Sequence, residues 1–279
     1  MKTNPSKTLV QPIHRYSLQK FAGVLVGGVT LAGSALTLHA TLIPVPNSSF
    51  ELQSGAGQFQ GISFAVDAWQ RNAEPGYFAP YEAFLDWSQT SAVFVGTSPN
   101  SANPYTNLDG SQAGYILDFP QAGFFQDYAT SPTHDFNATF QTGDAYSLTV
   151  GLFGKGLTPA SQFRISLYYR DTANTTNDPL GERTIVSSTL VNYDPLVFVN
   201  GPTPSLVDYT ASVPGVQATD LWAGQHIGIM LDEVAGAGSF AYWDFDNVRL
   251  VETAPVPEPA SAALLALGVC ALASRRRLA

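Results

Sequence analysis

Residues 146–152 have the sequence YSLTVGL, and residues 163–170 have the sequence FRISLYYR. The apolar residues occupy positions 146, 148, 150 and 152 in the first stretch and positions 163, 165, 167 and 169 in the second. Successive side chains of a β-strand point to opposite faces of the sheet, so each stretch would bury one face and expose the other. This alternation is typical of antiparallel sheets with one solvated face, and it predicts two β-strands.

The same period of two recurs towards the C-terminus. Positions 207, 209, 211 and 213 are apolar, as are positions 227, 229 and 231. Clusters rich in Gly, Pro, Asn and Asp separate the periodic stretches, at residues 141–144, 171–179, 200–202 and 236–238. Between the two ends of the chain no stretch shows convincing helical periodicity. We therefore expect an all-β fold, with a single antiparallel β-sandwich domain over residues 41–254.

The predicted domain is strongly acidic. Residues 41–254 contain 21 Asp and Glu against six Lys and Arg, although the whole chain of 279 residues has a net charge of only −9. Such a surface repels phosphate groups, so we expect no nucleic acid partner. The single cysteine, Cys270, lies near the C-terminus. The domain therefore contains no disulfide, no thiol nucleophile and no cysteine metal site.

The N-terminal segment has the three-part layout of a secretory signal peptide. Residues 1–20 contain four cations and no acid, residues 21–38 are uncharged, and Ala40 follows as a small residue. We expect a signal helix over residues 1–40 that signal peptidase removes after Ala40. An uncleaved membrane helix is the alternative, but the uncharged run is at the short limit for spanning a bilayer.

Residues 255–279 form a second segment with three parts. Pro257, Glu258 and Pro259 precede an uncharged stretch at residues 260–273, and three arginines follow it at the end of the chain, Arg275, Arg276 and Arg277. A helix of that length would reach about 21 Å, which is short for a permanent anchor in a hydrocarbon core of about 30 Å. This shortness suggests that another protein recognises the segment.

The layout resembles the PEP-CTERM sorting signal, whose name-giving motif matches Pro257-Glu258-Pro259. The resemblance implies a C-terminal hydrophobic helix that is processed by an exosortase-type membrane protease. It also implies secretion across the inner membrane of a Gram-negative bacterium and transient anchoring, with the arginines in the cytoplasm. The final location would be the outer surface or the extracellular matrix. A plain tail anchor is the alternative.

The domain itself resembles galactose-binding-like jelly rolls, a group that includes many carbohydrate-binding modules. The opening motif VPNSSFE at residues 45–51 and the closing motif FDNVRL at residues 245–250 look like the first and last strands of that fold. The resemblance implies that the two strands are neighbours and that Glu51 and Asp246 share a structural Ca²⁺ ion. Solvent-exposed charges at strand ends are the alternative for these two residues.

The closing motif also predicts a β-bulge. Phe245 and Val248 have opposite parity, so a regular strand could not bury both side chains. A bulge near Asp246 and Asn247 would bury both and would direct Asp246 out of the sheet.

Residues 69–87 are unusually rich in aromatic side chains. Aromatic faces stack on sugar rings, so four of these residues are candidates for binding extracellular polysaccharide: Trp69, Tyr77, Tyr81 and Trp87. In the alternative, Trp69 belongs to a core strand and the other aromatic residues close the end of the sandwich.

Catalytic patterns are weaker, and no catalytic residue is assigned. His134 and Asp135 are adjacent and would point apart on a strand, and no G-x-S-x-G motif supplies a nucleophile. Asp244 and Asp246 would lie about 7 Å apart on one side of a regular strand, a separation that a glycosidase pair could use. Some relatives of this jelly roll are calcium-dependent cyclases. The sequence favours an exosortase-sorted extracellular or surface protein without catalysis, with a carbohydrate-binding module and a calcium-dependent enzyme of the same fold as alternatives.

Overall fold

The computed structural model of the protein describes residues 40–52, 58–59, 62–94, 105–130, 136–199, 201 and 204–255. All of them belong to one compact unit, Leu36–Ala279. The predicted signal peptide up to residue 39, the sorting motif with its hydrophobic stretch and arginines, and His134 and Asp135 lie outside the described residues.

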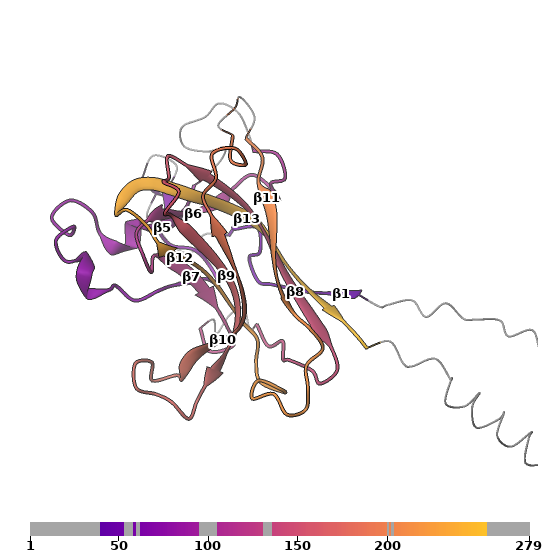
Figure 1. Ribbon diagram of the computed structural model, residues 1–279. Coiled ribbons are helices and arrows are strands. Elements are labelled where there is room, and N and C mark those ends of the chain that lie inside the picture. Colours follow the sequence, from indigo (N-terminus) through magenta and orange to yellow (C-terminus); the bar gives the residue numbers. More distant parts are fainter. Residues whose placement is uncertain are drawn as a thin grey trace, which may run out of the picture. The chain divides into compact units, whose positions relative to one another are not determined.

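The described residues form two antiparallel sheets that face each other across a core (Figure 1). The larger sheet has the order β11-β8-β13-β6-β5-β3-β2, with β1 also paired to β13. Its strands are β1 (Ala40–Ile43), β2 (Gln58–Phe59), β3 (Ile62–Ser63), β5 (Ser91–Phe94), β6 (Ala113–Asp118), β8 (Ala145–Lys155), β11 (Val207–Val213) and β13 (Ser239–Thr253). The smaller sheet has the order β10-β9-β12-β7-β4. Its strands are β4 (Gln70–Arg71), β7 (Gly123–Gln126), β9 (Gln162–Asp171), β10 (Glu182–Asn192) and β12 (Gly228–Ala235).

Helical structure in the described ranges consists of two short 3₁₀ turns, η1 (Gly76–Phe78) and η2 (Trp87–Gln89). Within those ranges no helix has the length and apolar character needed to cross a membrane. The prediction of an all-β sandwich is confirmed. The predicted helices at the two ends of the chain stay predictions, because both fall outside the described residues.

Strand β13 pairs with β8 along most of its length, with β6 through its first half and with β1 through its last four residues. Ala40 lies opposite Thr253, so the first and last strands are neighbours, as expected (Figure 1). The expected strand at the opening motif is wrong, because residues 45–51 form a turn. Asn47 and Phe50 there have φ angles of 48° and 55°, outside the range of regular extended strand, and the Asn47 side chain bonds both the N–H and the C=O of Leu52.

The predicted bulge in β13 is confirmed. The pairing of β13 with β8 shifts register between Asp246 and Arg249, and Asn247 has a φ angle of 57°. Phe245 and Val248 are consequently both buried. Asp246 is also fully buried, and its Oδ2 accepts a hydrogen bond from the Asp109 backbone N–H at 2.6 Å.

Aromatic side chains from both sheets make up the centre of the core. The Phe245 ring lies 5.0 Å from Phe50, 6.1 Å from Phe124 and 5.8 Å from Phe163, measured between ring centroids. Gly114 of β6 lies opposite Phe245 in the sheet, and a Cβ atom at that position would come within 2.5 Å of the ring. Gly114 is therefore required by the close packing of this ring.

Replacing Gly114 with Ala should destabilise the domain by about 1–3 kcal/mol, because the added methyl group overpacks a buried ring that cannot swing away. Chemical denaturation measures the change in unfolding free energy. Gly76→Ala is the matched control, since nothing lies within 4 Å of a Cβ atom there. Equal stability of the two variants would contradict the packing described for Phe245.

Two acidic side chains meet inside the core near the end of the sandwich. Glu233 of β12 and Asp118 of β6 are both fully buried, and no Lys or Arg of the described residues pairs with either. Among the described residues both Glu233 oxygens, Asp118 Oδ1 and the Trp243 indole N–H form no conventional hydrogen bond. Burial, and then the neighbouring Asp118 carboxylate, raise the pKa of Glu233 to about 10. Glu233 is therefore a neutral carboxylic acid at physiological pH.

Replacing Glu233 with Gln should stabilise the domain by about 1–3 kcal/mol at pH 8, because Gln keeps the shape and needs no bound proton. The pKa of Glu233 is higher in the folded state than the ordinary value of 4.5, so its contribution to stability is lost as pH rises from about 4.5 towards about 10. Urea denaturation between pH 5 and pH 9 should give a flatter profile for E233Q than for the wild type. The exposed residue Glu82 supplies the control variant E82Q, and a destabilised E233Q at pH 8 would contradict the neutral acid.

Candidate functional site

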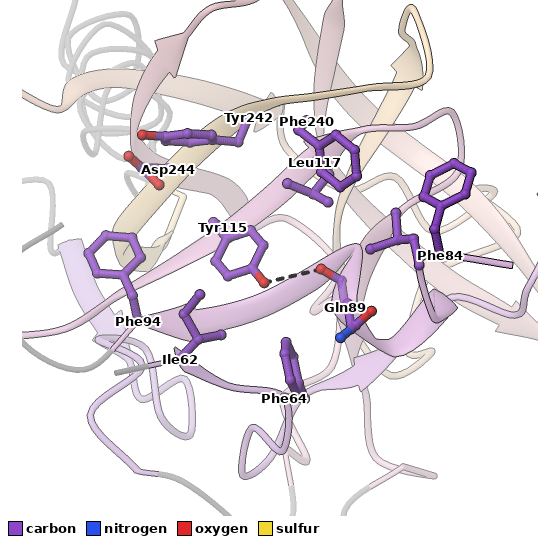
Figure 2. Close-up of a pocket in the computed structure, with 11 residues that line it drawn as sticks. Ile62, Phe64, Phe84, Gln89, Phe94, Tyr115, Leu117, Phe240, Tyr242 and Asp244 are labelled. Carbon is purple, nitrogen blue, oxygen red and sulfur yellow. Dashed lines mark hydrogen bonds between the residues drawn. The ribbon is translucent and has the colours of Figure 1, made fainter. Parts of the chain in front are cut away.

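The outer face of the larger sheet carries a cavity of about 380 Å³ (Figure 2). Trp243 and Phe245 of β13 point into the core, where both contact Phe163 of the other sheet. Tyr242 and Asp244, at the alternate positions, therefore face away from the core. The cavity is lined by Ile62, Phe64, Phe84, Leu85, Gln89, Phe94, Tyr115, Leu117, Phe240, Tyr242 and Asp244.

The pairing of β6 with β13 sets the floor of the cavity. Tyr115 lies opposite Asp244 and Leu117 lies opposite Tyr242, so the four side chains share one face of the sheet. Figure 2 shows Tyr115 at the centre, with Asp244 and Phe94 towards one end and Phe84 towards the other. The floor is therefore apolar and aromatic except for a single carboxyl group.

The segment around η2 forms a wall of the cavity. A capping box fixes this turn: Asp86 accepts a hydrogen bond from the Ser88 N–H at 2.7 Å, and the Gln89 side chain accepts one from the Asp86 N–H at 2.8 Å. The Gln89 carbonyl in turn accepts the Tyr115 hydroxyl at 3.1 Å (Figure 2). The aromatic segment at residues 69–87, expected to bind a ligand, thus contributes Phe84 and Leu85 to the cavity, and Gln89 follows it.

Asp244 is the one acidic residue that lines the cavity. Its side chain is fully buried, Oδ2 accepts a hydrogen bond from the Tyr105 hydroxyl, and Oδ1 has no partner among the described residues. Burial raises the pKa of Asp244 to about 7, although the Tyr105 hydrogen bond and the charge of Lys155 oppose the shift.

A carboxyl group with a pKa near 7 gives up and takes back a proton with almost equal ease at neutral pH, which is the property of a general acid or base. The aromatic side chains of the lining suit a flat, apolar ligand. The cavity is thus chemically equipped to bind such a ligand and to exchange a proton with it.

The four residues predicted to bind a ligand occupy different environments. Trp69 stacks on Phe50 in the core, and Trp87 is buried, with the indole N–H of each bonded to a backbone carbonyl. Tyr77 is 40% exposed and its hydroxyl bonds the Pro120 carbonyl, and burial of part of the ring raises its pKa to about 12. Tyr81 is partly buried, with its ring 5.1 Å from the ring of Phe119. The two tryptophans therefore serve the core, and the role of the two tyrosines in sugar binding stays a prediction.

The two residues predicted to bind calcium have different surroundings. The Glu51 carboxylate accepts hydrogen bonds from the backbone N–H groups of Ser111 and Gln112, at 2.6 and 2.7 Å. Asp246 keeps one buried oxygen, Oδ1, without a partner in the described residues. Burial, and then the charges of Asp109 and Glu51, raise the pKa of Asp246 to about 8, against the hydrogen bonds from the backbone. Within the described ranges, no group of three or more His, Cys, Asp or Glu residues is arranged to hold a metal ion.

Sequence reasoning considered Asp244 only as half of a carboxylate pair and did not find the cavity. The register shows that Asp244 and Asp246 do share a side of β13, opposite Phe153 and Gly151. The residues that line the cavity with Asp244 come from β3, β5, β6 and the segment before β5 as well as from β13. No spacing in the sequence indicates that these segments meet. The sequence did contain one indication of the site: Asp244 is a single acid among the bulky aromatic residues of YWDF at 242–245.

Comparisons with known proteins agree with this fold. The family model described as HpiC1 cyclase matches residues 41–251, and the PEP-CTERM protein-sorting motif matches residues 255–277. The search of curated proteins gave no match. The sorting motif implies an exported protein, extracellular or at the cell surface, that an exosortase processes at a membrane.

Several solved structures are similar to this chain. A cyclase from Fischerella sp. TAU is 20% identical, with a TM-score of 0.50, over 78% of this chain and 99% of that chain. A cyclase from the same organism, in complex with 4-(1H-indol-3-yl)butan-2-one, is 20% identical with a TM-score of 0.50, over 77% of this chain and 98% of that chain. A family 22 carbohydrate-binding module of Clostridium thermocellum Xyn10B is 12% identical with a TM-score of 0.37, over 77% of this chain and 99% of that chain.

At these identities the solved structures establish the fold, while the family model covers nearly the whole sandwich. The chain belongs to the HpiC1-like cyclase family and carries a PEP-CTERM sorting motif at its C-terminus.

Proposed function

We propose that this exported protein is an acid–base catalyst of the cyclase type, which binds an indole-like aromatic molecule in the cavity on the larger sheet. The observation that carries the proposal is Asp244, a buried carboxyl group with a pKa of about 7 and one unpartnered oxygen in an apolar cavity. Asp244 would donate its proton to the ligand, and its carboxylate would take a proton back when the ring closes. The reaction is an isomerisation that consumes no other reactant.

Size and chemistry support an aromatic ligand. A cavity of about 380 Å³ falls within the range of small-molecule sites. The rings of Phe94, Tyr115 and Tyr242 offer stacking surfaces, and the Oδ1 atom of Asp244, the Tyr242 hydroxyl and the Gln89 side chain offer polar contacts. Membership of the cyclase family and the indole ketone bound to the Fischerella relative point to the same ligand class.

Tyr105 would act as a positioning residue for the acid. Its hydroxyl donates to Oδ2 of Asp244, which directs the remaining proton of a neutral Asp244 to Oδ1. The Tyr105 ring packs 5.3 Å from Phe153, so the hydroxyl is held in place by the same face of the sheet.

The probe 4-(1H-indol-3-yl)butan-2-one tests this proposal directly. In D₂O, the wild-type protein should accelerate exchange of the carbon-bound hydrogens at indole C2 or beside the ketone, followed by proton NMR. Asp244→Asn should lower the rate by about 10²–10⁴-fold while keeping the shape of the cavity. The rate should change with an inflection near pH 7, because the pKa of Asp244 is about 7.

The control is Asp208→Asn, which removes a carboxylate of β11 that lies outside the cavity. Equal exchange rates in the wild type and in D244N would contradict the catalytic role. Binding of the probe to D244N, followed by indole fluorescence, separates loss of the acid from loss of the site.

A second candidate is binding of extracellular polysaccharide in the same cavity without catalysis. Phe84 and Phe240 line it, are 63% and 62% exposed, and lie 6.4 Å apart, so they could stack on sugar rings from solvent. Oligosaccharides from a bacterial extracellular matrix that displace the indole probe, together with an absence of exchange catalysis, would favour this candidate. The exosortase would then deliver a matrix-binding protein to the outer surface, after signal peptidase has removed residues 1–40.

We also propose a structural Ca²⁺ ion with Asp246 as its carboxylate ligand. The buried, unpartnered Oδ1 of Asp246 fits a cation. Glu51 fits less well, because its Oε1 already accepts two backbone N–H groups and its Oε2 accepts the Ser111 hydroxyl. Glu51 would instead support the site in two ways. It holds the turn at residues 110–112 through its hydrogen bonds, and it adds a second negative charge close to Asp246.

Saturating calcium should raise the melting temperature of the wild type and leave Asp246→Asn unchanged. At about 100 times the dissociation constant the gain is about 2.7 kcal/mol. Differential scanning calorimetry with Ca²⁺ or EGTA measures it, with Mg²⁺ as the control ion. If calcium has no effect, Asp246 is a buried neutral acid. Stability would then be lost as pH rises from about 4 to about 8, since its pKa is raised in the folded state.

A further inference from the structure

The outer face of the smaller sheet carries a second cavity, of about 580 Å³, which the cyclase proposal does not use. Phe125 of β7, Arg164 of β9 and Arg183 of β10 line it, together with Met230 and Asp232 of β12. Its lining is rich in charged and amide side chains, unlike the apolar cavity on the other sheet.

Arg183 is held rigidly in this cavity. Its guanidinium group lies 4.0 Å from the centroid of the Phe125 ring, and Nη1 donates to Asn72 Oδ1 at 2.7 Å and contacts the Met230 sulfur at 3.7 Å. The ring below and the amide at one edge fix the plane of the guanidinium group. Its remaining N–H groups have no hydrogen-bond partner among the described residues.

Both arginines of β9 have carboxylate partners, and Arg71 of β4, which also lines the cavity, donates to the backbone carbonyls of Ser91 and Phe64. Arg164 forms a bidentate pair with Asp232, at 3.0 and 2.6 Å, and Arg170 pairs with Asp127 and Asp178, at 2.7 and 2.8 Å. Arg183 pairs with no carboxylate in the described ranges, although residues 41–254 contain 21 acidic residues and only six Lys and Arg. An unpaired, immobilised guanidinium group in an acidic domain is a preformed place for a carboxylate from another molecule.

Polar groups beside Arg183 suit a ligand that carries hydroxyl groups as well. Glu182 and Asn177 line the same cavity, and Oε1 of Glu182 accepts the Asn177 backbone N–H at 2.6 Å, while no bond in the described structure involves Oε2. Asp178 and Asp232 are neutralised by Arg170 and Arg164, so they add little repulsion towards an anion.

We propose that the cavity around Arg183 binds a uronate, with the sugar carboxylate on the guanidinium fork and the sugar hydroxyls on Glu182 and Asn177. An exported protein meets such acidic sugars in extracellular polysaccharides. The site lies on the smaller sheet, whereas Asp244 lies on the larger one, and the two cavities share no lining residue. The uronate proposal can therefore be tested independently of the cyclase proposal.

Trigalacturonate is the probe, and its methyl ester is the matched neutral ligand. Isothermal titration calorimetry of the full domain should show saturable binding of the acid and at least about tenfold weaker binding of the ester. Arg183→Lys keeps the charge but loses the planar fork, so it should weaken binding of the acid by at least about tenfold. Arg249→Gln, which removes a cation of β13 paired with Asp208, should leave the affinity unchanged.

A measurement on the wild-type protein tests the proposal without depending on how the variants fold. The Nε–H resonance of Arg183, assigned by its absence from the spectrum of R183K, should shift on addition of trigalacturonate and stay in place with the ester. Equal binding of acid and ester would overturn the carboxylate assignment. Binding of acetate as tight as that of trigalacturonate would overturn the sugar assignment. Absence of binding by every probe would overturn the proposal as a whole.

Discussion

The structure depends on the two-residue period of β13, because one strand supplies both the core and the cavity. Trp243 and Phe245 point between the sheets, and Tyr242 and Asp244 point to the outer face. A shift of register by one residue would place the acid in the aromatic core and the tryptophan in the cavity. Such a shift is opposed at both ends of the strand. The pairing with β1 fixes its last four residues, and the close contact between Gly114 and Phe245 fixes its first half.

Three of the buried carboxyl groups have a raised pKa, between about 7 and about 10, so each of them carries less than a full negative charge near neutral pH. Glu233, Asp244 and Asp246 are all fully buried, and burial is the main cause of the raised pKa of each. With so few cations in the domain, pairing every acid with a cation is impossible, and two of the arginines, Arg164 and Arg170, already pair with Asp127, Asp178 and Asp232. Desolvation without a compensating cation is also the condition that gives Asp244 a pKa suited to proton transfer. The acidic composition and the candidate chemistry thus have the same physical origin.

Much of the fold could be predicted from the sequence, since the alternation at residues 146–152, 163–170 and 207–213 agrees with β8, β9 and β11. The bulge followed from the parity of Phe245 and Val248. The turn at residues 45–51 was missed because Asn47 and Phe50 adopt left-handed backbone angles that depend on tertiary contacts, including the bond from Trp69 Nε1 to the Asn47 carbonyl. The cavity was missed for a similar reason: strand order, which no local pattern contains, brings Ile62, Tyr115 and Tyr242 together.

The cavities on the two sheets differ in the ionisable group that each contains without a partner of opposite charge. They therefore suit ligands of different chemistry. The cavity on the larger sheet contains an acid without a cation partner, Asp244, surrounded by aromatic side chains that disfavour its ionised form. The cavity on the smaller sheet contains a cation without a carboxylate partner, Arg183, which lies over the Phe125 ring. A neutral aromatic molecule suits the first environment and an anion suits the second. Because the aromatic core separates the two faces, a change in one cavity reaches the other only by loosening the packing between them.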